Sequence, residues 1–109
     1  MTDKKPIVWV AQEARNVDYS DAERFGEVHF MTADEFKPLA NSHLNPGIIE
    51  AIDRAAAAFD PRTDSLVLTG NPVVIGYVFH KVRDKADCGF NILSWDKMRG
   101  CYNSFVFTF

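Results

Sequence analysis

The sequence predicts an α/β domain with a mixed sheet of about five strands and two main helices, although an α+β arrangement also fits. Two observations support this prediction. Short runs of β-forming residues alternate with two apolar stripes of helical period, and the chain closes with two aromatic-rich runs around a turn. The length of 109 residues, with 47% hydrophobic and 25% charged, is that of a single domain, residues 1–109.

The N-terminal part is expected to contain two strands, at residues 7–11 and 27–31, each rich in β-forming side chains. The first is apolar throughout, which predicts burial on both faces. Residues 12–25 lie between them and have no hydrophobic period, which predicts a long surface loop or a short irregular helix. Residues 32–35 read Thr-Ala-Asp-Glu, the pattern of a capping box. We therefore expect a short helix from there to about residue 40.

Both main helices are expected to follow an Asn-Pro pair, in which Asn45 or Asn71 caps the helix and proline takes the first helical position. The first covers residues 46–59, where apolar side chains recur at helical spacing. A strand at 65–69 leads into the second, residues 72–85. The second helix is apolar nearly all round, so it must be covered on more than one side.

The C-terminal part is expected to form a hairpin from strands at 90–95 and 101–109, with a turn at 96–100. The strand at 65–69, the helix after it and the strand at 90–95 predict a Rossmann-like βαβ unit. Its two strands should be parallel and its crossover right-handed. The antiparallel hairpin then makes the sheet mixed.

Charge argues against a role in nucleic-acid binding. The chain has 12 Lys and Arg residues against 15 Asp and Glu residues, a net charge of −3, so it has no basic excess to attract a phosphate backbone. Such a role would need a local patch built from the basic residues of the C-terminal third, Lys81, Arg83, Lys85, Lys97 and Arg99. Acidic residues gather instead in residues 11–35, and the two poles of opposite sign could steer a partner or a second copy of the chain, or form ordinary solvated faces.

Cysteine content and the N-terminal run favour the cytoplasm and argue against a membrane protein. The apolar run at 7–11 is too short for a signal-peptide core or a membrane span. Cys88 and Cys101 match neither a metal pattern nor a disulfide-rich scaffold, so reduced thiols are expected. A bridge between them stays open if their segments pair as a hairpin.

The candidate ligand site is the turn between the strand at 65–69 and the helix after it. Thr69, Gly70 and Asn71 lie there, where free N–H groups at a helix start favour a phosphate or carboxylate. Against this, Pro72 removes one donor and no G-x-G-x-x-G or P-loop lysine is present, so a plain turn and helix cap is the alternative. The histidines have no metal-ligand spacing, and we expect no catalytic residue, metal or cofactor.

The candidate interface is either the closing hairpin, with Phe105, Phe107 and Phe109, or the apolar second helix, with Tyr77. An alternating apolar strand at a sheet edge invites pairing with another chain. We therefore expect a homo-oligomer, with a dimer as the simplest form.

The runs Asp64–Pro72 and Phe90–Asp96, with the apolar helix between them and a basic turn after them, resemble small, mostly uncharacterised bacteriophage and prophage α/β proteins over residues 64–104. The resemblance implies a small phage-type protein in the host cytoplasm that binds a host factor or blocks a host defence. The leading hypothesis, which rests on the C-terminal aromatics, the acidic loop and the lack of a catalytic motif, is a non-enzymatic protein-interaction domain that binds a host protein or self-associates. The alternative is a small ligand-binding or enzymatic domain that holds an anionic group, phosphate or nucleotide, at the Thr-Gly-Asn-Pro turn.

Overall fold

The computed structural model describes residues 5–33 and 46–109, and this part of the chain has the predicted α/β fold with a mixed five-stranded sheet. From residue 34 on, the predicted short helix lies outside the described residues. In chain order the elements are β1 (Ile7–Gln12), the 3₁₀ helix η1 (Ser20–Phe25), β2 (Glu27–Thr32), α1 (Pro46–Ala58), β3 (Ser65–Val67), α2 (Pro72–Lys85), β4 (Gly89–Asp96) and β5 (Cys101–Thr108).

The strands lie in the order β2-β1-β3-β4-β5. All neighbours run parallel except β4 and β5, which form the predicted antiparallel hairpin. The parallel pairing of β3 with β4 around α2 confirms the predicted βαβ unit. No helix of the described residues is long and apolar enough to cross a membrane.

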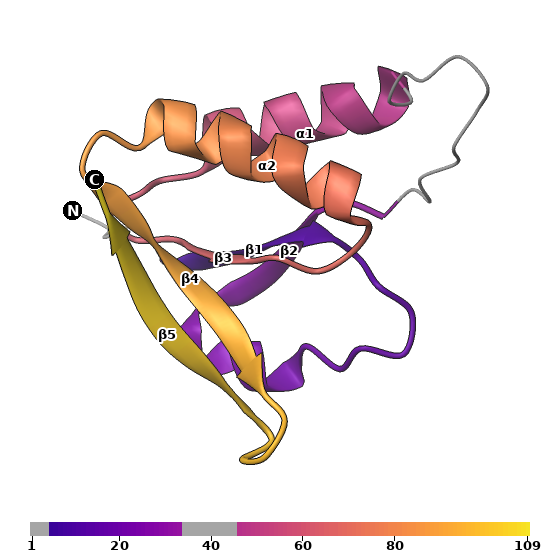
Figure 1. The fold of residues 1–109 in the computed structure, drawn as a ribbon, viewed down its shortest axis with the longest axis vertical. Helices are drawn as coiled ribbons and strands as arrows, with labels where there is room; N and C mark the ends of the chain where they lie inside the picture. The colour runs from indigo at the N-terminus through magenta and orange to yellow at the C-terminus, as the bar shows by residue number, and fades with distance from the viewer. Residues whose placement is uncertain (1–4, 34–45) are drawn as a thin grey trace.

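The two α-helices cover one face of the sheet and η1 lies on the other (Figure 1). The connections β2-α1-β3 and β3-α2-β4 cross the sheet in one direction, whereas β1-η1-β2 crosses it in the other. Crossovers of a single hand then place α1 and α2 on one face and η1 on the opposite face. The fold therefore has a complete helical layer above the sheet and a small partial layer below it.

Each face of the sheet has its own core, because successive strand residues point to opposite faces. Trp9 and Ala11 of β1 face the α-helices, whereas Val8 and Val10 face η1. The larger core lies under α1 and α2 and includes Ile48, Ile52, Phe59, Leu66, Val74, Val78, Val82 and Phe90. The smaller core contains Ala22, Val67, Leu93 and Tyr102. The strand predicted at 7–11 is thus buried on both faces, as its apolar run indicated.

A buried carboxylate joins the N-terminal ends of β1 and β3. Asp64, 1% exposed, accepts hydrogen bonds from the backbone N–H of Ile7 at 2.9 Å and from Trp9 Nε1 at 3.2 Å. The N–H of Asp60 and the hydroxyl of Thr63 donate to the same carboxylate at 2.9 and 3.1 Å. Because a buried charge needs such donors, Asp64 fixes the chain after α1 against the start of the sheet.

Helix α2 is covered on three sides, as its nearly uniform apolar character predicted. Val74, Val78 and Val82 recur every four residues and are fully buried against the sheet. Tyr77, on one flank, contacts α1, where its hydroxyl donates to Asp53 Oδ1 at 2.5 Å. Phe79, on the other flank, packs against the ring of Phe107 in β5 with the centroids 5.9 Å apart. Only the ridge away from the sheet remains exposed.

Candidate functional site

The carboxyl ends of β1 and β3 form a topological switch point. The chain leaves β1 towards η1 on one face of the sheet, and it leaves neighbouring β3 towards α2 on the other. In open α/β sheets such a divergence creates the crevice in which ligands bind. A cleft of about 770 Å³ lies at this point, lined by residues 12–17, Ala33, Gly70 and Asn71.

Gln12 ties the two strand ends together beneath this cleft. Its side chain is buried, and its Oε1 accepts from the backbone N–H of Asn71 at 2.7 Å. Its backbone N–H donates to the carbonyl of Thr69 at 3.2 Å. Gly70 passes so close, at φ +114°, that a Cβ there would come 2.4 Å from Gln12 Oε1. β3 ends at Val67, two residues before the predicted residue 69.

A short relay of hydrogen bonds holds the loop after β1. The Thr69 hydroxyl donates to the carbonyl of Gln12 at 2.9 Å, so the Tyr19 hydroxyl, 2.9 Å away, donates to Thr69. Tyr19 in turn accepts from the N–H of Ala14 at 3.0 Å. Residues 12–25, predicted as a loop or an irregular helix, thus form a loop pinned to β3 and then η1.

Of the predicted anion-binding residues, Gly70 and Asn71 line the cleft, whereas Thr69 just before them does not, and several N–H donors of this turn are already engaged. The N–H of Asn71 donates to Gln12, and the N–H of Val73 donates to Asn71 Oδ1 at 2.9 Å. Pro72 has no N–H to offer. The turn-and-cap alternative therefore accounts for most of this geometry, and a ligand here would be held by residues of the β1 loop, such as Arg15.

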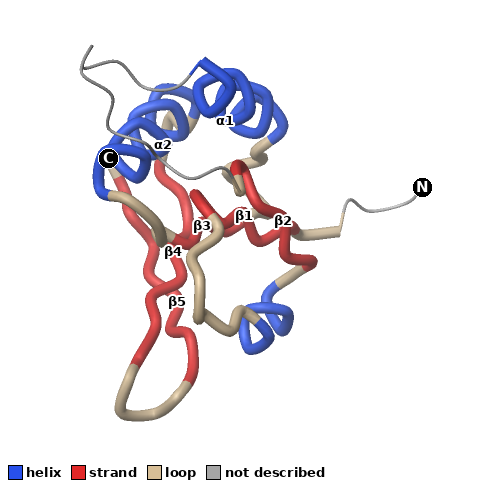
Figure 2. Tube along the Cα trace, turned by 90° about the vertical axis from the view of Figure 1, so that its right-hand side faces the viewer, coloured by secondary structure: helices blue, strands red, loops and turns tan. Residues whose placement is uncertain are grey.

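The second candidate site is the β4–β5 hairpin, which extends beyond the rest of the sheet (Figure 2). Phe105, Phe107 and Phe109 are 51%, 42% and 50% exposed. All three point to the face of the sheet that α2 covers, as the predicted alternation required. Phe107 packs on Phe90 with the ring centroids 6.1 Å apart. Tyr77, the candidate interface residue of the second helix, lies on the other flank of α2 against Asp53. That hydrogen bond raises the pKa of Tyr77.

The hairpin end of β5 is held by η1. Asp21 Oδ2 accepts from the backbone N–H of Tyr102 at 2.7 Å, and Arg24 donates to the Tyr102 carbonyl. Asp21 and Arg24 are themselves paired, with Oδ1 3.3 Å from Nε. The Tyr102 ring is 1% exposed, and burial raises the pKa of its hydroxyl. The η1 helix therefore caps the outer backbone groups of β5 at this residue.

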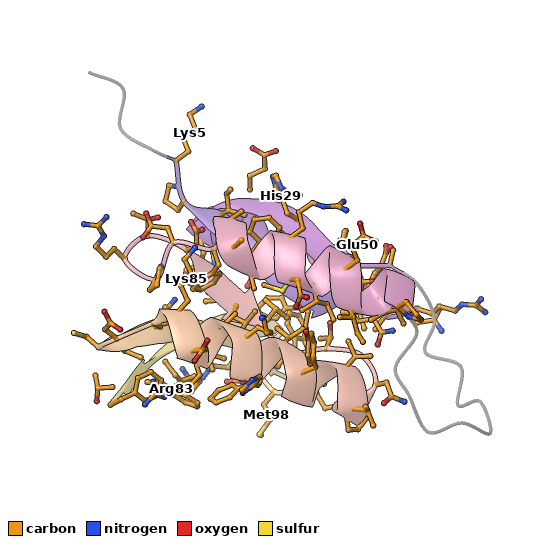
Figure 3. All side chains as sticks on the ribbon, turned by 90° about the horizontal axis from the view of Figure 1, so that it is seen from above. Lys5, His29, Glu50, Arg83, Lys85 and Met98 are labelled. Atoms are coloured by element: carbon orange, nitrogen blue, oxygen red, sulfur yellow. The ribbon has the colours of Figure 1, made fainter. Side chains whose placement is uncertain are left out.

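The five basic residues do not form one patch. Three belong to α2 and two to the hairpin turn, at opposite ends of β4. Lys85 donates to the carbonyl of Ala56 at the end of α1, and Lys81 Nζ lies 3.6 Å from Asp53. Arg83 stacks over Phe109, 3.8 Å from the ring centroid, and Figure 3 shows it on the side of α2 away from α1.

Both cysteines are free. The segments do pair as a hairpin, but Cys101 stands opposite Asp96 at the turn while Cys88 lies at the far end, beside Phe109. Among the described residues, no group of three or more His, Cys, Asp or Glu side chains could hold a metal.

Sequence reasoning missed three groups that shape these sites: Gln12, Asp64 and the Asp21–Arg24 pair. Gln12 is the first polar residue after the apolar run of β1, which was the available signal for a residue at a strand end. Asp21 and Arg24 have the i, i+3 spacing of a helical ion pair. Their contact with a strand 81 residues away has no local signal.

Comparison with known proteins gives one match. The model of a family described as phage Pam3 gp32-like protein matches residues 6–109. This match confirms the resemblance to small phage proteins and extends it from residues 64–104 to nearly the whole chain. No curated protein and no solved structure matches.

Proposed function

We propose that this chain, which belongs to the phage Pam3 gp32-like family, is a non-enzymatic protein-interaction domain that binds through the free edge of β5. The observation that carries the proposal is the placement of exposed apolar side chains. Of the nine large hydrophobic residues that are exposed in the described chain, six lie between Trp95 and Phe109. These side chains flank the β5 edge on both faces of the sheet, exposed apolar groups mark interaction sites, and an edge strand can pair with a strand of another polypeptide.

The partner is a protein of the infected host or another copy of the chain. Membership of a phage family supports a host protein as the partner, since a phage protein is made inside the host cell. Free Cys88 and Cys101 agree with a reducing cytoplasm as the compartment. To pair with the β5 edge, a partner needs only an extended, largely apolar segment, because backbone hydrogen bonds supply part of the affinity.

The experiment compares proteins captured from a host lysate by the wild type and by two lysine variants. Val106→Lys places a charge on the β5 edge, where Val106 is 68% exposed. Val73→Lys is the matched control, the same substitution at a valine that is 53% exposed at the start of α2. We expect a partner, or the chain itself, to be retained by the wild type and the Val73 variant only. Identical retention by all three proteins would remove the proposal.

A ligand-binding function at the switch-point cleft is the second candidate function, and the position of the cleft favours it. The cleft lies where crossovers diverge, and Arg15 and the N-terminal end of α2 border it. An anionic group, phosphate or nucleotide, is the ligand class expected there. Titration with nucleotides and sugar phosphates should then shift the amide NMR signals of residues 12–16 and 69–73, and unchanged signals at saturating ligand would exclude this site.

A further inference from the structure

The outer edge of β5 is divided into a capped part and an open part. The N–H of Phe109 donates to the carbonyl of Cys88 at 3.3 Å, which shows that odd-numbered residues of β5 face β4. In an antiparallel pair the intervening residues turn their backbone groups outward. Tyr102 confirms this alternation, because its outward groups are the ones bound by Asp21 and Arg24. Ser104, Val106 and Thr108 therefore present the next outward groups.

No strand of the described chain lies beyond this open part, which is the last of the sheet. Strand edges are usually protected by lysine, proline or a bulge. From Asn103 to Phe109 the sequence has neither charge nor proline, and every residue of β5 has a partner in β4 without a bulge. The open part thus lacks the features that keep two such edges apart.

We propose that two copies of the chain pair through this open part, antiparallel about a twofold axis at Val106. This assignment rests on the proposed function and names a second copy as the occupant. With Val106 opposite its own copy, Ser104 stands opposite Thr108, so all three outward residues form hydrogen-bonded pairs. The two five-stranded sheets then become one continuous sheet of twice the width.

The side chains suit a second copy because the same register matches them by type. On the helix face Phe105 of each copy stands opposite Phe107 of the other, an aromatic cross-strand pair. On the opposite face Val106 meets Val106. No charge lies in the paired stretch, so identical strands meet without like-charge repulsion. The capped Tyr102 limits the pairing to the open part and so favours this register over one shifted towards the turn.

The area indicates a reversible dimer. Three half-exposed phenylalanines and one valine offer on the order of 400 Å² of apolar surface per copy, given the 150–250 Å² that an aromatic side chain can bury. A standard stable interface buries about 800 Å² per partner, so with the strand backbone added the contact reaches the weaker end of specific interfaces. The dimer should therefore dissociate on dilution.

The first test is sedimentation equilibrium over a wide range of concentration. The wild type should move from 12.3 kDa towards twice that mass as concentration rises. Val106→Lys and Val106→Pro should each raise the dissociation constant by roughly tenfold or more. The lysine variant sets two like charges opposite each other, and the proline variant removes the N–H donors of the central backbone hydrogen bonds. Val73→Lys should dimerise as the wild type does. A wild type that stays monomeric throughout would overturn the inference, while the lysate capture decides the proposed function separately.

The second test reads the register. In a background of Cys88→Ser and Cys101→Ser, Val106→Cys should form a disulfide-linked dimer on mild oxidation. The two Cα atoms would be about 5.5 Å apart, within the range of about 4.4–6.8 Å that a disulfide spans. Ser104→Cys faces Thr108 of the other copy rather than itself, so it should remain monomeric on a non-reducing gel. Equal crosslinking of both variants, or none by Val106→Cys, would overturn the proposed pairing.

Discussion

The two edge strands of the sheet are protected in different ways. β2 has six residues and carries a polar pair at its start, the exposed Glu27 with Oε1 3.1 Å from His29 Nε2. β5 has eight residues, no charge, and apolar side chains that are 42–68% exposed from Phe105 to Phe107. The charge of Glu27 discourages pairing with another strand, whereas β5, within residues 5–33 and 46–109, is protected only where η1 caps Tyr102. Protection by sequence and protection by tertiary contact thus occur in one sheet.

The largest expected effect distinguishes the capped part of β5 from the open part. Tyr102→Ala should lower the free energy of unfolding by about 3–5 kcal/mol, because it empties the space of a buried ring between the sheet and η1. Phe105→Ala, at a half-exposed ring of the same strand, should cost less than about 1.5 kcal/mol. Urea denaturation measures both. Equal losses would mean that the two parts of β5 contribute alike to stability.

The next effect tests the cap itself. Asp21→Ala should lower the free energy of unfolding by about 2 kcal/mol, because the N–H of Tyr102 loses a charged acceptor at 2.7 Å. Hydrogen exchange at the Tyr102 amide should accelerate by the factor that corresponds to this loss of protection. Glu23→Ala, an exposed acidic residue of the same 3₁₀ helix, is the control and should change stability by less than about 0.5 kcal/mol. If Tyr102 exchange is unchanged in Asp21→Ala, η1 does not protect this edge.

A smaller effect is expected from alkaline pH. Burial raises the pKa of Tyr102 above its ordinary value of 10.0, and Tyr19, Asp18 and Asp21 add to the shift. The folded state then holds the phenolic proton more tightly than the unfolded state, so this stabilisation is complete below pH 10 and is lost as pH rises through the raised pKa. Urea denaturation between about pH 9 and 11 should show the decline, and Tyr102→Phe should make it shallower. The same slope in both proteins would assign the decline to other groups.

The smallest effect on stability comes from making β2 resemble β5. Glu27→Val removes the exposed charge from the β2 edge and should change the free energy of unfolding by no more than about 0.5 kcal/mol. It should instead add self-association that Val106→Lys does not suppress, because the new contact lies on the other side of the sheet. Glu27→Gln keeps the edge polar and serves as the control. Light scattering would refute the idea if the valine and glutamine variants behave alike.

Much of the fold followed from local pattern. The apolar stripes and Asn-Pro starts predicted α1 and α2 to within one or two residues, and the period of two placed Phe105, Phe107 and Phe109 on one face. β3 was the main exception, since it ends at Val67, two residues before the predicted end. The close approach of Gly70 to Gln12, 58 positions earlier in the chain, likewise has no signal in a local period.

The candidate sites were predicted only in part. Gly70 and Asn71 line a cleft, but the sequence did not show that Gln12 accepts the N–H of Asn71. The second helix was one of two predicted association surfaces, and its position in the fold turns Tyr77 towards Asp53 of α1. A helical period shows which residues share a face, and packing decides which neighbour each flank meets.

The sequence by itself determined the elements, their two-faced burial and the uncharged, aromatic character of the last strand, because these depend on residue type and spacing alone. Only the tertiary structure decided the strand order, the switch point between β1 and β3, and the division of the β5 edge at Tyr102. The reason is that crossover direction and long-range hydrogen bonds join residues far apart in the chain. A strand becomes an edge, and an edge becomes capped or open, only through the neighbours that folding gives it.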